Sequence, residues 1–158
     1  MLLTVTSMQG LTHLVQSPLV ENAGVCGRFA HFNERAVAAV ERRDSARREV
    51  ITSFGSAGEC ADAIVADHAA IVALRAFRRE VGDSLTALRV RDVPEDQDER
   101  AGAALILQHV ERIDDWLDGR LRVHDSAFDS LLTFVSNVRS DRKLPPGFVP
   151  NPDLDPID

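Results

Sequence analysis

The chain has 158 residues with 18 basic and 25 acidic side chains, and its net charge is −7 at neutral pH. A protein built around the phosphate backbone of nucleic acid has a positive binding face, so this balance predicts no nucleic-acid partner. No run of 18 apolar residues occurs, so we predict no membrane partner either. The length suits one domain with its own core.

The basic residues are almost all arginine, with Lys143 the one lysine, and Ala, Val and Asp are abundant. This bias indicates a GC-rich coding sequence, as in a high-GC bacterium or a phage that infects one. The first ten residues lack the basic region of a secretory signal, and two cysteines, Cys26 and Cys60, are too few for a disulfide framework. We therefore expect a cytoplasmic protein whose thiols are buried on apolar helix faces.

Residues 1–16 are moderately apolar without clear periodicity. They predict an N-terminal arm that is a short strand, a helix or a segment that docks on a neighbour. Ser17 and Pro18 then have the chemistry of a helix cap and a first helical position, and Gly55 marks the end of this first helical stretch. Its apolar stripe comprises Val25, Cys26, Phe29, Phe32, Ala36 and Val40.

The segment RRDSARR at residues 42–48 interrupts this stripe. Either the helix breaks near Asp44 and Ser45, or its apolar face passes beyond the bundle at this point. The segment predicts a solvated turn that pairs with acidic residues of a neighbouring helix, or a docking patch for an acidic partner such as the tail of another copy. Its four bases are Arg42, Arg43, Arg47 and Arg48.

Ser56 and Glu59 have the spacing of a capping box, which predicts the start of a second helix that ends at Gly82. Residues 83–91 fit either a short helix or an extended connector. The apolar face of the second helix comprises Cys60, Ile64, Ile71, Leu74, Phe77 and Val81.

Asp67 falls in the middle of that apolar face, because it shares a line along an ideal helix with Cys60 and Leu74. A buried carboxylate without a partner would cost several kcal/mol. We therefore expect Asp67 to have a partner, which is an arginine, His109, His124 or a metal held with these histidines.

Asp92 and Glu95 form another box and predict a third helix from Asp92 to Asp118, with Gly119 as its stop. A fourth helix is expected from about residue 125, and its apolar stripe comprises Phe128, Leu131, Leu132, Val135 and Val138.

Four helical segments with short turns and no convincing strand predict an all-α fold, a four-helix-bundle-like single domain over residues 17–143. Residues 144–158 contain five prolines, three aspartates and no base, which predicts an extended, Pro/Asp-rich C-terminal tail. The apolar residues available to anchor this tail are Phe148, Val149, Leu154 and Ile157.

The predicted helices carry one histidine each, and bundle interiors can build metal sites from histidines and carboxylates on facing helices. ADHAAI at 66–71 and HVERIDDWL at 109–117 resemble short pieces of hemerythrin-type bundles. This resemblance implies oxygen or redox chemistry at iron, manganese or zinc. The chain lacks the H-x-x-x-E and H-x-x-x-H pairs of that family, because the residues four after its histidines are Arg35, Val72, Ile113 and Phe128. The candidate ligands are Asp67, His68, His109 and His124.

No nucleophile elbow, glycine-rich phosphate loop or other convergent catalytic motif is present, so we expect no enzymatic activity and predict no cofactor. The leading hypothesis is a non-catalytic helical protein that acts by protein–protein association, as a homo-oligomer or as a subunit or adaptor of a larger assembly. The basic segment at 42–48 and the apolar tail residues are its candidate contact sites. The alternative hypothesis is the metal-binding bundle.

Overall fold

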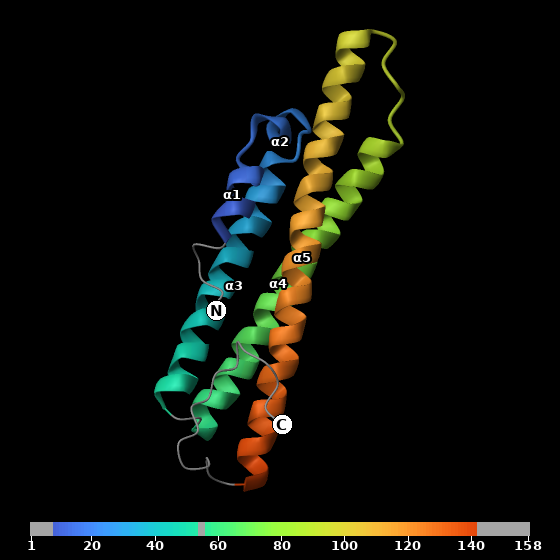
Figure 1. The fold of residues 1–158 in the computed structure, drawn as a ribbon. Coiled ribbons are helices and arrows are strands. Elements are labelled where there is room, and N and C mark those ends of the chain that lie inside the picture. Colours follow the sequence, from blue (N-terminus) through green and yellow to red (C-terminus); the bar gives the residue numbers. More distant parts are fainter. Residues whose placement is uncertain (1–7, 54–55, 142–158) are drawn as a thin grey trace.

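The computed structural model describes residues 8–53 and 56–141, and Figure 1 shows their arrangement. Five helices follow one another: α1 (Gln9–Val15), α2 (Pro18–Asn22), α3 (Cys26–Thr52), α4 (Ala57–Arg89) and α5 (Gln97–Asp141). Within these ranges every regular element is a helix, which confirms the predicted all-α class.

The three long helices run antiparallel, and α4 packs against both α3 and α5 (Figure 1). The short helix α1 packs against α3 and α5, and α2 packs against α5. Met8, Leu11 and Val15 are buried in the core. The N-terminal arm is therefore helical from Gln9 onward and packs on its own domain; residues 1–7 lie outside the described part.

Two polar contacts fasten α1 to its neighbours. Asn33 Nδ2 on α3 donates to Thr12 Oγ1 at 3.1 Å, and His109 Nε2 on α5 donates to the backbone carbonyl of Leu14 at 2.7 Å. Gly10 approaches Trp116 so closely that a Cβ at Gly10 would lie 3.2 Å from the indole Nε1.

The start of the first helical stretch is correctly predicted, but its course is not. Ser17 caps α2, accepting a hydrogen bond from the Leu19 amide at 3.2 Å. The chain then turns at Gly24, whose φ of 76° favours glycine, and α3 begins at Cys26. From there α3 continues unbroken through Asp44 and Ser45 to Thr52, so a break near these residues, one of the two alternatives from the sequence, does not occur.

The predicted helix boundaries at Gly82 and Gly119 are wrong. Residues 83–89 continue α4, and α5 runs through Gly119 for 45 residues, so the predicted third and fourth helices are one. Helix α5 also begins later than expected, because Asp96 rather than Asp92 caps it and accepts a hydrogen bond from the Glu99 amide at 2.9 Å. At the start of α4, Ser56 makes no side-chain capping bond.

The core consists of two clusters. The larger one spans α1 to α5 in the upper part of the bundle and includes Phe29, Leu74, Phe77 and Ile113. The smaller one lies near the opposite end and comprises Val50, Cys60, Ala63, Leu131, Phe134 and Val135. Cys60 is buried as predicted, but Cys26 is exposed, because the preceding Val25 takes the core position at the start of α3.

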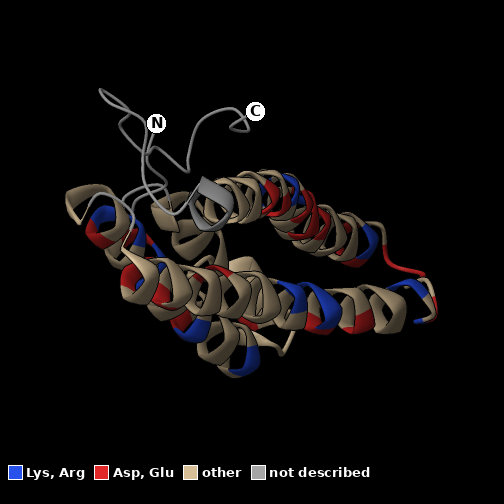
Figure 2. Cartoon of the chain, turned by 90° about the horizontal axis from the view of Figure 1, so that it is seen from below, with Lys and Arg blue, Asp and Glu red and all other residues tan. Residues whose placement is uncertain are grey.

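The outer surfaces of the helices carry charges of both signs, and red and blue residues are interspersed in Figure 2. Arg78 on α4 binds two carboxylates on α5, Asp114 at 3.2 Å and Asp118 at 2.8 Å. None of the helices in the described ranges has the combination of length and apolarity that a bilayer span needs.

Candidate functional site: a buried ion cluster and an apolar hollow

Consecutive turns of α3 direct charged side chains into the bundle. Arg43, Asp44 and Arg47 are 0%, 1% and 0% exposed. Arg43 and Arg47 continue the helical spacing of Val40 and lead on to Val50, so they occupy core positions of an uninterrupted stripe. The predicted solvated turn is therefore wrong for these two arginines.

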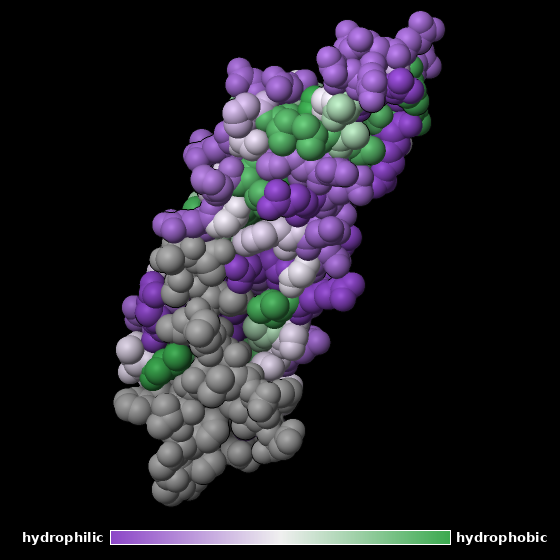
Figure 3. All heavy atoms as spheres, turned by 45° about the horizontal axis from the view of Figure 1, so that its top comes forward, coloured by the Kyte–Doolittle hydropathy of each residue, from purple (hydrophilic) through white to green (hydrophobic). Residues whose placement is uncertain are grey.

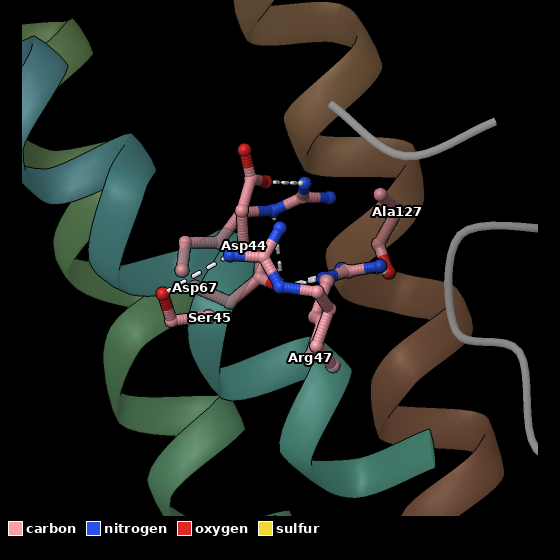
Figure 4. A network of polar contacts seen from close by, with 7 residues as sticks. Asp44, Ser45, Arg47, Asp67 and Ala127 are labelled. Atoms are coloured by element: carbon pink, nitrogen blue, oxygen red, sulfur yellow. Dashed lines mark hydrogen bonds and ion pairs between the residues drawn. The ribbon is translucent and has the colours of Figure 1, made fainter. Parts of the chain in front are cut away.

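Arg47 joins all three long helices (Figure 4). Its Nε donates to Asp67 Oδ2 on α4 at 2.6 Å, and a second guanidinium nitrogen forms an ion pair with the same oxygen. Its Nη2 also donates to the backbone carbonyl of Ala127 on α5 at 2.9 Å. A fully buried arginine is tolerated here because the Asp67 carboxylate balances its charge, and because Asp67 and the Ala127 carbonyl accept its hydrogen bonds.

Arg43 completes the cluster one turn earlier on α3. Its Nη1 lies 2.7 Å from Asp44 Oδ1, and its Nε lies 3.7 Å from Asp67 Oδ2. Asp67 is 0% exposed, as its position on the apolar face of the second helix predicts. Its partners are arginines of the preceding helix.

His124 on α5 lies in the same interior and is 0% exposed. Burial and, after it, the positive charges of Arg43, Arg120 and Arg47 together lower the pKa of His124 to about 3. Neither ring nitrogen has a hydrogen-bond partner among the described residues. The imidazole is therefore neutral across the physiological range and acts as a core side chain.

The four predicted metal ligands are not brought together. Asp67 is engaged by the two arginines, His109 binds the carbonyl of Leu14, and His68 is exposed with its ring centroid 6.2 Å from that of Phe128. Nowhere in residues 8–53 and 56–141 do three or more His, Cys, Asp or Glu side chains form a group suited to a metal ion. The chemistry of the cluster is instead that of an internal clamp between α3, α4 and α5.

Arg42 and Arg48, unlike the two central arginines, are exposed. Arg48 donates to Ser45 Oγ at 3.3 Å. The prediction of a docking patch therefore remains for these two residues alone. The predicted anchors Phe148, Val149, Leu154 and Ile157 lie outside the described residues.

A second feature lies at the far end of the α4–α5 pair. Helix α4 and the start of α5 extend beyond α3 there, and the connecting segment 90–96 runs beside α5 (Figure 1). Between them is a hollow of about 440 Å³. Its apolar wall comprises Leu88, Val93, Pro94, Ala103, Ala104, Ile106 and Leu107.

Much of this apolar surface is open to solvent. Val93 on the wall of the hollow is 76% exposed. The neighbouring Val90 and Leu105, which do not line the hollow, are 76% and 55% exposed. Figure 3 shows hydrophobic surface gathered near this end of the molecule. Arg89, Arg91 and Arg100 line the hollow with one acid, Asp92, so three positive charges face one negative charge.

The hollow is not among the sites predicted from the sequence, although residues 103–107 indicate exposed apolar surface in this region. The run AALIL is apolar at five consecutive positions, more than one helix face can bury. Ile106 and Leu107 turn toward the core cluster, which leaves Ala103, Ala104 and Leu105 uncovered.

The fold defines an antiparallel all-α bundle, and comparison with known proteins adds no narrower class. No protein-family model, no curated protein and no solved structure matches the chain.

Proposed function

We propose that this protein acts by protein–protein association, with the hollow at the free end of the α4–α5 pair as its contact surface and further copies of itself as the partner. The supporting observation is the exposed apolar wall of the hollow. Exposed apolar patches rimmed by polar residues are typical of interaction sites on soluble proteins. The rim of arginines suits such a site, since arginine is enriched in protein interfaces.

The ion cluster supports a structural role beside this contact. It is closed inside the bundle and its carboxylates are occupied by arginines, so it offers a substrate neither access nor a reactive group. We therefore assign no catalytic step to the ion cluster. Its role in the proposal is to hold α4 and α5 in a fixed register, so that the hollow at their free end keeps its shape.

A matched pair of substitutions tests the proposal. Val93→Asp places a charge on the wall of the hollow, whereas Val65→Asp makes the same change at a residue of α4 that is 69% exposed and lies outside the hollow. Sedimentation velocity over a range of concentrations should show reversible association of the wild-type chain and of Val65→Asp, and its loss in Val93→Asp. A wild-type chain that stays monomeric, or equal association of both variants, would contradict the proposal.

A further inference from the structure

We infer that the hollow receives the C-terminal tail, residues 144–158, of a second copy of the chain. This inference rests on the proposed function and specifies what occupies the contact surface. It combines three observations: the chemistry of the hollow, the chemistry of the tail and the distance between them.

The hollow and the tail are complementary in polarity and in charge. The hollow has an apolar wall lined by three arginines and one aspartate. The tail carries no base, and Leu154 stands between Asp153 and Asp155. An apolar side chain flanked by carboxylates therefore matches an apolar surface flanked by guanidinium groups, which can bind carboxylates in a bidentate geometry.

The composition of the tail suits binding in an extended form. Five prolines among fifteen residues predict extended, polyproline-like conformations for this segment. A segment that is already restricted loses less conformational entropy when it binds, so modest contacts suffice for association.

Leu154 and its flanking aspartates cannot enter the hollow of their own chain. The end of α5 lies at the opposite end of the molecule from residues 90–96 and the start of α5, which line the hollow (Figure 1). At 1.5 Å per helical residue, Ala104 and Asp141 are about 55 Å apart along α5. A fully extended chain beyond Asp141 carries Leu154 only about 45 Å, and only the last two residues reach about 55 Å. A contact through Leu154 must therefore form between copies, with the tail of one entering the hollow of the next.

Such a contact is heterologous, because it joins two different surfaces. It leaves a free hollow on one copy and a free tail on the other, so copies add in series unless the rotation between them closes a ring.

Two full-length variants that each disable one half of the contact provide the test. The hollow variant is Val93→Asp, and the tail variant combines Phe148→Ser with Leu154→Ser. Each variant alone should associate at least about tenfold more weakly than the wild type, the loss expected for one buried apolar side chain. Mixed together, they should form a one-to-one pair that does not grow, because the mixture contains one intact hollow and one intact tail.

A synthetic peptide of residues 144–158 supplies an independent measurement. It should bind the tail variant saturably, with an affinity that falls as salt rises, and it should not bind Val93→Asp. Unchanged helical circular dichroism of Val93→Asp would show that the fold survives the substitution.

The outcomes separate the two proposals. If Val93→Asp loses association while the tail variant keeps it, the tail does not occupy the hollow, and association through the hollow stands. If neither variant changes the association constant, both proposals are wrong. A mixture of the two variants that fails to pair overturns the contact between hollow and tail.

Discussion

The buried charges of this bundle are balanced residue by residue. Two arginines from α3 meet Asp44 on the same helix and Asp67 on α4, and all four side chains are at most 2% exposed. Burying an ion pair is costly in itself, and removing one member costs more, because the other charge stays behind without its partner. The cluster therefore makes the alignment of α3 with α4 sensitive to single substitutions.

Asp67→Asn tests this sensitivity. We expect it to lower the free energy of unfolding by about 3–5 kcal/mol, because Arg47 keeps its charge in the interior. The double variant Arg47→Met with Asp67→Leu should lose less, since it removes one charge of each sign and the remaining buried charges, Arg43 and Asp44, still pair with each other. Urea unfolding measures both, and Arg75→Met at the exposed Arg75–Asp125 pair, a change of less than about 1 kcal/mol, is the control.

Equal losses in the single and double variants would contradict this account of the cluster. Loss of stoichiometric iron, manganese or zinc in Asp67→Asn would instead support the metal-binding alternative.

His124 predicts a pH dependence of stability. The folded pKa is about 3, whereas the ordinary value is 6.5, so the unfolded chain takes up a proton between these values and the folded chain does not. Stability is therefore retained above pH 6.5 and falls as the pH decreases, by up to about 1.4 kcal/mol per pH unit. The groups around the imidazole are Arg43 and Arg47 from α3 and Arg120 from α5.

The measurement compares urea unfolding at pH 7 and pH 5, a window in which carboxylates are still largely ionised. Wild type should lose about 2 kcal/mol, and His124→Leu should remove most of that slope. His31→Leu changes an exposed histidine and should keep the slope. A wild-type stability that does not fall between pH 7 and pH 5 would contradict the prediction.

The sequence predicts that Asp67 is buried and names an arginine among its possible partners, but it does not decide between arginine, histidine and metal. Helical periodicity places Asp67 on an apolar face, and burial then requires a partner. Arg43 and Arg47 occupy stripe positions of the preceding helix, so the same periodicity places them on the face that meets Asp67. From the sequence alone these arginines predict an interruption of the stripe, because charged side chains are mostly exposed to solvent. Only their pairing with Asp67 on the next helix makes burial possible.

At the scale of helices, the predicted ends at Gly82 and Gly119 are both wrong for one physical reason. Glycine in a helix costs about 1 kcal/mol relative to alanine, and this cost is offset wherever the apolar stripe stays in phase. In α5 the stripe crosses Gly119 without a shift of phase. Its members are Ile113, Leu117, Leu121, His124, Phe128, Leu131 and Val135. The prediction of an all-α fold rests on the apolar stripes and is confirmed. The predicted helix ends rest on the glycines and are wrong.

Gly119→Ala should therefore stabilise the protein. Gly119 is exposed in the middle of α5, and an added Cβ would meet nothing within 4 Å. We expect a gain of about 0.5–1 kcal/mol in the free energy of unfolding. Gly24→Ala is the matched substitution of opposite sign, because the φ of 76° at Gly24 costs an alanine about 1–2 kcal/mol. Destabilisation by Gly119→Ala would mean that α5 is not continuous there.

The whole molecule is elongated, because its length follows α5. At 1.5 Å per residue, 45 helical residues span about 65 Å. A compact domain of this chain length would have a radius of gyration of about 15 Å. Small-angle X-ray scattering of a dilute sample should therefore give a larger radius and a maximum dimension of at least about 65 Å.

The same scattering experiment on concentrated protein tests the mode of association. Addition in series should lengthen the particle without thickening it, whereas side-by-side pairing would increase the cross-section. Val93→Asp should keep the dilute dimensions at every concentration. A wild-type cross-section that grows with concentration would contradict the serial arrangement.

The close approach of Gly10 to Trp116 has a practical consequence. Trp116 is the only tryptophan of the chain, it is partly buried beside α1, and the guanidinium carbon of Arg120 lies 4.9 Å from its ring centroid. Its fluorescence therefore reports whether α1 is docked on α5, whereas circular dichroism is dominated by the three long helices. An emission shift that precedes the loss of helical signal during unfolding would identify α1 as the part of the bundle that detaches first.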